Sequence, residues 1–242
     1  MTYPHIRVLS LLAVFALALA PLVAEGAAAE KPTAVTPFNG KNLEGWKAQG
    51  PIDQSKWTVG VAQVDPANPR RLIAAPAGDA PGELITCEGH GRDLYTEQKF
   101  GDCTIEVEVM VPQGSNSGIY VMGEYEIQVL DSHGRTGLSP GDMGGLYAAK
   151  GPDVNATKKP GEWQKFVIEF VAPKFKDGKK ISNATFVKVT LNDKVIQKDV
   201  EMQKQTPGGV AGKEAPEGPL MFQGNHGAVA YRNVKIILPK KK

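Results

Sequence analysis

Cysteine and histidine are scarce in this chain, with two cysteines and four histidines among 242 residues. Cys87 and Cys103 stand alone, because neither belongs to a CxxC pair or lies beside a histidine at the spacing of a zinc site. A zinc site built on cysteine is therefore not expected. A Cys87–Cys103 disulfide stays an open alternative, because pairing depends on the separation and direction of the two Cβ atoms.

A strong net charge is also missing, since the formal charge is +2. The basic residues are scattered, apart from the lysines at 240–242, and no basic stripe with interleaved aromatic residues occurs. Nucleic acid is therefore not expected as a partner.

Long apolar runs are absent except at residues 8–23, which follow Arg7 and precede the small residues at 26–29. This order of charge, apolar core and small residues predicts a secretory signal peptide over residues 1–29. The alternative is a membrane anchor, because about 16 apolar residues approach the length of a span. We expect cleavage, no stable membrane insertion afterwards, and a secreted or periplasmic protein.

A long amphipathic helix is missing as well, and period-2 alternation dominates beyond a linker at residues 30–36. Apolar side chains alternate with polar ones in several runs, which predict strands with one buried face. These runs are 104–111, 124–130, 163–171, 185–191 and 229–238. Glycine and proline cluster between them, where turns are needed. The pattern predicts an all-β domain over residues 37–242, built as an antiparallel sandwich or jelly roll.

Several segments together resemble the 3-keto-disaccharide hydrolase domain family. They are FNGKNLEGW at 38–46, NSGIY at 116–120, YEIQVLD at 125–131, PGEW at 160–163 and GNHG at 224–227. The resemblance implies a concanavalin-A-like jelly-roll sandwich of two antiparallel sheets, one of them concave. It also implies an enzyme that cleaves 3-keto-glycosides, either by hydrolysis or by 1,2-elimination followed by hydration. The expected partner is a small carbohydrate substrate.

The implied chemistry sets the residue types to look for. A ketone at C3 acidifies the hydrogen on C2, because the resulting carbanion is an enolate. A general base can then remove that proton while the C1 substituent leaves. Such a site needs a base of suitable pKa, a group that stabilises the enolate and an acid for the leaving oxygen. A divalent metal as the stabilising group is an open alternative.

Glu124, Glu126 and Gln128 alternate along one predicted strand and therefore share a face, and Asp131 follows at its end. Such a face is often simply solvated. With the family resemblance, we expect it to line a sugar-binding cleft. Glu126 and Asp131 are then catalytic candidates, whereas Gln128 and Glu124 are substrate-binding candidates.

Histidine is the second source of candidates, because an imidazole carries protons near neutral pH. His226 lies inside a family motif, and His133 follows Asp131 by two residues, so both are catalytic candidates. His90 has no such support and is expected to be solvated.

Four further residues are candidates for substrate binding: Asn116, Ser117, Tyr147 and Gln223. Tyr147 suits stacking on a sugar ring or core packing equally well. The chain departs from the resemblance at Val121 and Met122, where many family members carry an arginine.

Two other functions stay open. A non-catalytic carbohydrate-binding module is the main alternative, because the same fold serves binding proteins and function resides in the site. A glycosidase with two carboxylates is weaker, because Glu124 and Glu126 lie on one strand and cannot easily flank a bond from opposite sides.

Overall fold

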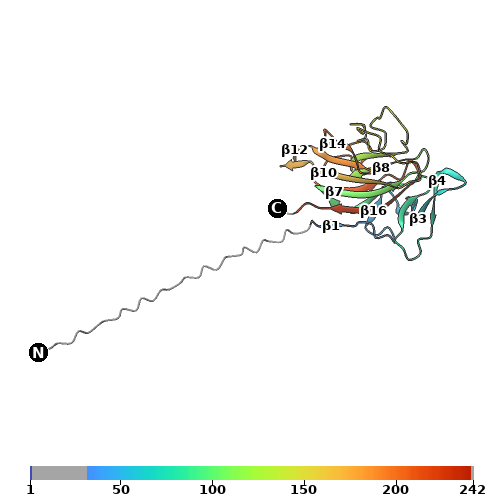
Figure 1. The fold of residues 1–242 in the computed structure, drawn as a ribbon, viewed down its shortest axis with the longest axis horizontal. Helices are drawn as coiled ribbons and strands as arrows, with labels where there is room; N and C mark the ends of the chain where they lie inside the picture. The colour runs from blue at the N-terminus through green and yellow to red at the C-terminus, as the bar shows by residue number, and fades with distance from the viewer. Residues whose placement is uncertain (2–31, 241–242) are drawn as a thin grey trace. The chain divides into compact units, whose positions relative to one another are not determined.

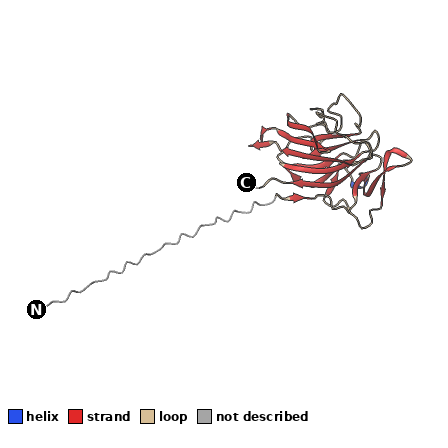
Figure 2. Cartoon of the chain, in the orientation of Figure 1, coloured by secondary structure: helices blue, strands red, loops and turns tan. Residues whose placement is uncertain are grey.

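The computed structural model describes Met1 and residues 32–240, so the expected signal peptide, apart from Met1, lies outside the described residues. The chain divides into two units, Met1–Lys31 and Pro32–Lys242, and all the strands that the structure describes lie in the second. Its described part is nearly all β structure, with a single short 3-10 helix, η1 (Ile52–Gln54) (Figure 2). None of the described helical structure has the length and apolarity needed to cross a membrane.

The larger sheet has nine strands and runs across the domain in Figure 1. Its order is β14-β13-β10-β7-β16-β5-β3-β4, and β1 also pairs with β16. All its pairings are antiparallel. The bounds are β1 Ala34–Val35, β3 Trp57–Asp65, β4 Asn68–Ala75, β5 Glu83–Thr86, β7 Cys103–Met110, β10 Gln164–Val171, β13 Ala184–Leu191, β14 Lys194–Met202 and β16 Val229–Ile237.

The smaller sheet has five antiparallel strands in the order β2-β6-β15-β8-β9. Its strands are β2 Trp46–Ala48, β6 Leu94–Phe100, β15 Gly218–Phe222, β8 Asn116–Val121 and β9 Tyr125–Leu130. A separate hairpin is formed by β11 (Lys174–Lys176) and β12 (Lys179–Ser182).

The core lies between the two sheets and follows the alternation of the sequence. Ile105, Val107 and Val109 of β7 are buried in it, and the intervening residues are half-exposed. Tyr231 of β16 stacks on Phe222 of β15 at 3.9 Å between ring centroids, which joins the larger sheet to the smaller one. Burial of this apolar surface is the main stabilising contribution to folding. The expectation of an all-β sandwich of two antiparallel sheets is confirmed.

The outer face of the smaller sheet carries the polar residues of β8 and β9. Ile119 of β8 and Ile127 of β9 oppose each other and belong to the core. Because side chains alternate along a strand, Tyr120 and its partner Glu126 point to the other face, as does Gln128. The long connections after β9 and after β14 form backbone hydrogen bonds with the β8–β9 hairpin.

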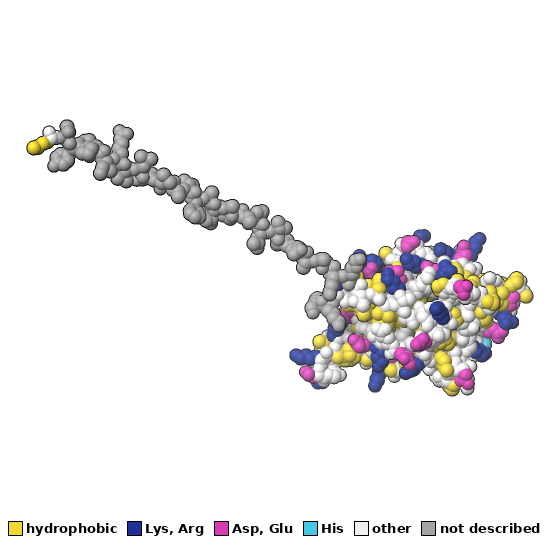
Figure 3. Space-filling model, turned by 90° about the horizontal axis from the view of Figure 1, so that it is seen from below, with side chains coloured by type: hydrophobic (Ala, Val, Ile, Leu, Met, Phe, Trp, Pro, Cys, Tyr) yellow, Lys and Arg dark blue, Asp and Glu magenta, His cyan; other side chains and the backbone are white. Residues whose placement is uncertain are grey.

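The two cysteines lie in different parts of the core and are not bonded. Cys103 is buried in the main core, whereas Cys87 is half-buried against a smaller cluster. Both are free thiols, so the disulfide alternative is not realised. On the face drawn in Figure 3, basic and acidic side chains are interspersed rather than gathered by sign.

Candidate active site

Glu126 and Tyr120 form the centre of the polar face. They oppose each other across the β8–β9 ladder, and the Tyr120 hydroxyl donates a 2.8 Å hydrogen bond to Oε2 of Glu126. Glu126 is 3% exposed, and its backbone N–H donates to Oγ1 of Thr206 at 3.0 Å. A Cβ on Gly118 would lie 2.4 Å from Oε1 of Glu126, so the carboxylate requires glycine at that position. The side chain is therefore buried, oriented and tightly enclosed.

Burial raises the pKa of Glu126 from 4.5 to about 7. The hydrogen bond from Tyr120 acts in the opposite direction, and the negative charge of Asp93 raises the pKa further. A carboxylate with a pKa near 7 holds a proton or releases it at physiological pH, which suits a general base or acid. Such displaced pKa values are typical of functional sites.

Asp93 is a site residue that the sequence did not reveal. It precedes β6, is 4% exposed, and accepts a 2.9 Å hydrogen bond from the backbone N–H of Gly224. Burial raises its pKa, while Gly224 and the nearby His226 act against this. A single aspartate outside any alternating run carries no sequence signal, and only the fold brings it into the electrostatic neighbourhood of Glu126.

His226 reaches the same region from the loop that follows β15. Its ring is exposed, and Nδ1 contacts Oδ1 of Asn225. The side chain of Asn225 donates in turn to Asp93 at 3.5 Å, the outer limit of a hydrogen bond. The structure thus brings His226 beside Asp93, and Asp93 beside Glu126.

Three amide side chains surround these groups. Gln128 donates a 2.6 Å hydrogen bond to Oδ1 of Asn116, its neighbour on the same face. Gln223 is buried, and its amide nitrogen lies 3.5 Å from the Tyr120 hydroxyl. Amides of this kind offer donors and acceptors for sugar hydroxyls or for an enolate oxygen.

Tyr147 lies beside β9. Its backbone N–H donates to the carbonyl of Glu126 at 3.1 Å, and its side chain is 39% exposed. It lines a cavity of about 700 Å³ together with Thr206, Pro207 and Gly208. Tyr147 is thus a surface aromatic next to the candidate base rather than a core residue.

Two of the predicted binding residues are engaged elsewhere. Ser117 is fully buried on the core side, where its hydroxyl donates to the carbonyl of Gln223 and contacts the Tyr231 hydroxyl. The expectation that Ser117 contacts substrate is therefore corrected, because Ser117 lies two residues before the core residue Ile119 and shares its face of β8. Glu124 is buried, and its Oε1 accepts a 2.7 Å hydrogen bond from the backbone N–H of Ala211.

Asp131 and His133 also lie apart from the Glu126 cluster. The Asp131 carboxylate accepts backbone N–H groups of Gly114 at 2.9 Å and of His133 at 3.4 Å, which stabilises two turns. The His133 side chain is exposed. Within residues 32–240, no group of three or more His, Cys, Asp or Glu side chains is arranged to hold a metal ion.

Three of the five segments that carry the family resemblance, 116–120, 125–131 and 224–227, contribute residues to this site. The model of the 3-keto-alpha-glucoside-1,2-lyase-like domain family matches residues 33–237. The chain belongs to this family. It is also 31% identical over 107 residues to a 3-keto-disaccharide hydrolase of Bacteroides thetaiotaomicron, and this match covers 44% of the chain and 32% of that relative. The aligned part thus spans about a third of the relative's length.

Solved structures give the same family of folds. A Parabacteroides distasonis protein, provisionally described as a glycosyl hydrolase, matches with a TM-score of 0.62 and 26% identity, covering 85% of this chain and 84% of that one. A second such protein from the same organism has a TM-score of 0.57 and 19% identity over 86% and 94% of the two chains. The concanavalin-A-like jelly-roll sandwich implied by the sequence is confirmed.

Proposed function

We propose that this member of the family cleaves 3-keto-glycosides and that Glu126 is the base that removes the C2 proton. The observation that supports this most directly is the Glu126 carboxyl itself. It is buried, held by the Tyr120 hydroxyl at 2.8 Å, and has a pKa raised to about 7. A carboxylate on a merely solvated sheet face would have none of these properties.

The proposed elimination balances as follows. The C2 proton moves to Glu126, the C2–H electron pair forms the enolate of the C3 ketone, and the C1–O bond breaks. The leaving oxygen takes a proton from the Asp93–His226 pair, in which burial raises the pKa of Asp93. Water then adds at C1, Glu126 returns its proton to C2, and the water proton restores the acid. The sum is one water consumed per glycosidic bond.

Polar and aromatic neighbours supply the binding groups. Gln223 offers a buried amide donor to the developing enolate, and such donors stabilise charge best in a buried setting. Gln128 and Asn116 are fixed by their mutual hydrogen bond and suit the hydroxyls of the sugar. Tyr147 borders the neighbouring cavity and offers a ring for stacking on the sugar face.

The test uses purified protein with 3-keto-trehalose or a chromogenic 3-keto-glucoside, with and without a chelator. We expect cleavage of the keto compound and no cleavage of the unmodified glucoside, because without the ketone the C2 hydrogen is not acidic. Loss of activity with chelator would assign a role to a metal. Binding of the sugar without turnover would support the alternative, a carbohydrate-binding module of the same fold.

We also propose that the protein is exported, because the apolar run at 8–23 followed by small residues is typical of a cleaved signal peptide. The mature N-terminus is then expected between residues 24 and 31. Mass spectrometry of the exported protein would locate it, and exported protein that still begins at Met1 would contradict cleavage.

A further inference from the structure

The segment of residues 206–212, here called the strap, follows β14 and precedes β15 in the chain. It lies against the β8–β9 hairpin. Thr206 donates its backbone N–H and its hydroxyl to the carbonyl of Glu124, at 2.9 and 3.0 Å. The same hydroxyl accepts the backbone N–H of Glu126. The carbonyl of Pro207 lies 3.2 Å from the Tyr120 hydroxyl. The strap therefore contacts both members of the Glu126–Tyr120 pair.

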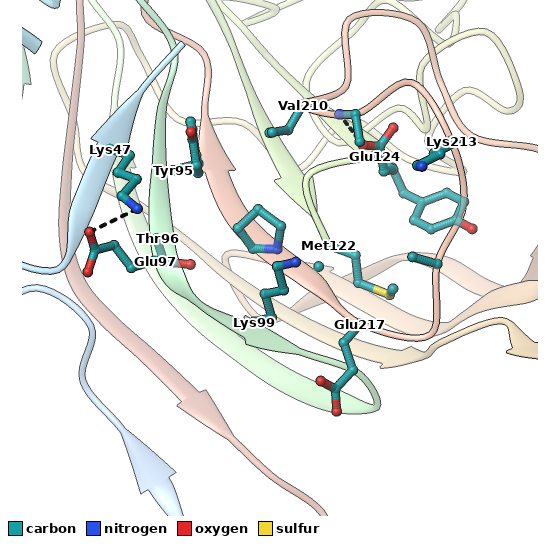
Figure 4. A pocket seen from close by; sticks show the side chains of 15 residues that line it. Lys47, Tyr95, Thr96, Glu97, Lys99, Met122, Glu124, Val210, Lys213 and Glu217 are labelled. Carbon is teal, nitrogen blue, oxygen red and sulfur yellow. Dashed lines mark hydrogen bonds and ion pairs between the residues drawn. The ribbon is translucent and has the colours of Figure 1, made fainter. Parts of the chain in front are cut away.

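The side chain of Glu124 fastens the other end of the strap. Its Oε1 accepts the N–H of Ala211 at 2.7 Å, drawn as a dashed line in Figure 4, and the N–H of Val210 donates to the carbonyl of Gly123. Glu124 is 5% exposed. Its Oε2 has no hydrogen-bond partner among the described residues, and a Cβ on Gly209 would come within 2.2 Å of it. The carboxylate of Glu124 is thus closely packed against the backbone of the strap.

Cavities adjoin the strap at both of its ends. One of about 360 Å³ adjoins Val210 and Ala211 and is also lined by Glu124, Met122 and Lys99 (Figure 4). The cavity of about 700 Å³ adjoins residues 206–209. Apolar packing against a solid core therefore contributes little to holding the strap in place. Its hydrogen bonds to the hairpin must do so, and Glu124 takes part in three of them through its carbonyl and its carboxylate.

We propose that Glu124 is a positioning residue: its carboxylate fastens the strap, and the fastened strap excludes water from Glu126 and holds the Tyr120 hydroxyl in place. Glu124 itself touches no substrate in this proposal. Its role in the reaction rests on the proposed function, whereas its effect on the protonation of Glu126 can be measured without any substrate.

The effect of the strap on Glu126 is one of burial rather than charge. Residues 206–212 carry no charged side chain. The titratable groups around Glu126 come from other elements: Tyr120 of β8, Asp93 before β6, His226 beyond Asp93, Tyr147 after β9, Tyr231 of β16 and Glu124 on the same hairpin. Since burial is the leading cause of the raised pKa of Glu126, a released strap lowers that pKa while these groups remain.

The experiment disturbs the contact between the Glu124 carboxylate and the strap by changing each partner in turn. Glu124→Ala removes the fastening carboxylate, and Gly209→Ala places a Cβ where Oε2 of Glu124 lies. Glu217→Ala is the control, because Glu217 lines the same cavity and is exposed. The carboxyl titration of Glu126 is followed by NMR on protein with labelled glutamate, and its signal is assigned with Glu126→Gln.

We expect the titration midpoint to fall from about 7 toward 4.5 in both variants and to stay near 7 in the control. The double variant should match Glu124→Ala alone, since contacts between neighbours are not additive. In kinetics, kcat/KM should fall about tenfold or more through misplacement of the base, and its acidic limb should move to lower pH.

A purely structural role would lower the melting temperature and leave the titration unchanged, and that result overturns the proposal. Should Glu124→Ala fail to fold, Gly209→Ala and Glu124→Gln decide the matter. Glu124→Gln keeps the acceptor for Ala211 and is expected to leave the midpoint near 7. A wild type that cleaves no 3-keto-glycoside would overturn the proposed function, but the titration would still decide the role of Glu124.

Discussion

The Tyr120 hydroxyl has two acceptors within reach, Oε2 of Glu126 at 2.8 Å and the carbonyl of Pro207 at 3.2 Å. Burial raises the pKa of Tyr120, so its single proton is retained. When Glu126 is ionised, that proton belongs in the hydrogen bond to the carboxylate. When Oε2 of Glu126 carries a proton, the Tyr120 hydroxyl can accept a hydrogen bond from it and donate its own proton to the carbonyl of Pro207. Both protonation states of the proposed base are thus satisfied without movement of the backbone.

Glu126→Gln keeps the size and the hydrogen-bonding capacity of the side chain and removes its basicity. We expect turnover of a 3-keto-glucoside to fall by about 10²-fold or more, the scale of general-base catalysis. Steady-state kinetics with a chromogenic substrate measures this. Full activity in the variant would remove Glu126 from the mechanism.

Tyr120→Phe removes the hydrogen bond that stabilises the ionised form of Glu126. The pKa of Glu126 should therefore rise above about 7, and the acidic limb of the kcat/KM profile should move to higher pH. Loss of this bond should also cost about 1 kcal/mol of stability. A pH profile identical to that of the wild type would contradict this role of Tyr120.

Asp93→Asn is expected to shift the pKa of Glu126 in the opposite direction to Tyr120→Phe. The amide can still accept the N–H of Gly224 through its oxygen, but the negative charge near Glu126 is gone. The pKa of Glu126 should fall, and the acidic limb should move to lower pH. Because Asp93 is also the proposed acid partner of His226, turnover should drop at every pH. A profile that moves the same way as in Tyr120→Phe would refute the assignment.

The raised pKa of Glu126 also affects folding. A carboxyl whose pKa rises from 4.5 to about 7 on folding binds its proton more tightly in the folded state. Its contribution is fully present below pH 4.5 and is lost between pH 4.5 and 7, a change of about 3 kcal/mol. Urea denaturation of wild type and Glu126→Gln across this range should show the wild type losing that amount relative to the variant. Parallel curves would contradict the displaced pKa.

Much of the fold could be predicted because burial on one face leaves a period of two in the sequence. The run at 104–111 is strand β7 (Cys103–Met110), and the run at 185–191 is β13 (Ala184–Leu191). The sequence did not predict strand β5, because all four of its residues are buried and apolar and polar side chains do not alternate in it. The sequence did not predict strand β4 either, because it is an edge strand with a single buried residue and therefore shows no alternation.

The site was only partly predictable for a related reason. Period two correctly placed Glu126 and Gln128 on one face, opposite the core residue Ile127. It could not reveal Asp93, which approaches Glu126 from the loop before β6 and lies in no alternating run. Nor could it show that Ser117 points inward, since that depends on which sheet face β8 turns to the core. Contacts between distant segments are set by the fold, and a single sequence does not display them.

The pairing of β1 with β16 brings Ala34 opposite Ile237, and the N–H of Leu238 donates to the carbonyl of Thr33. Paired residues of antiparallel strands lie about 5 Å apart at their Cα atoms. A short peptide could therefore join the two ends of the jelly roll, and new ends could be opened at the Asp177–Gly178 turn of the β11–β12 hairpin. Such a circular permutant would keep every strand of the sandwich and would place the chain ends at the β11–β12 hairpin.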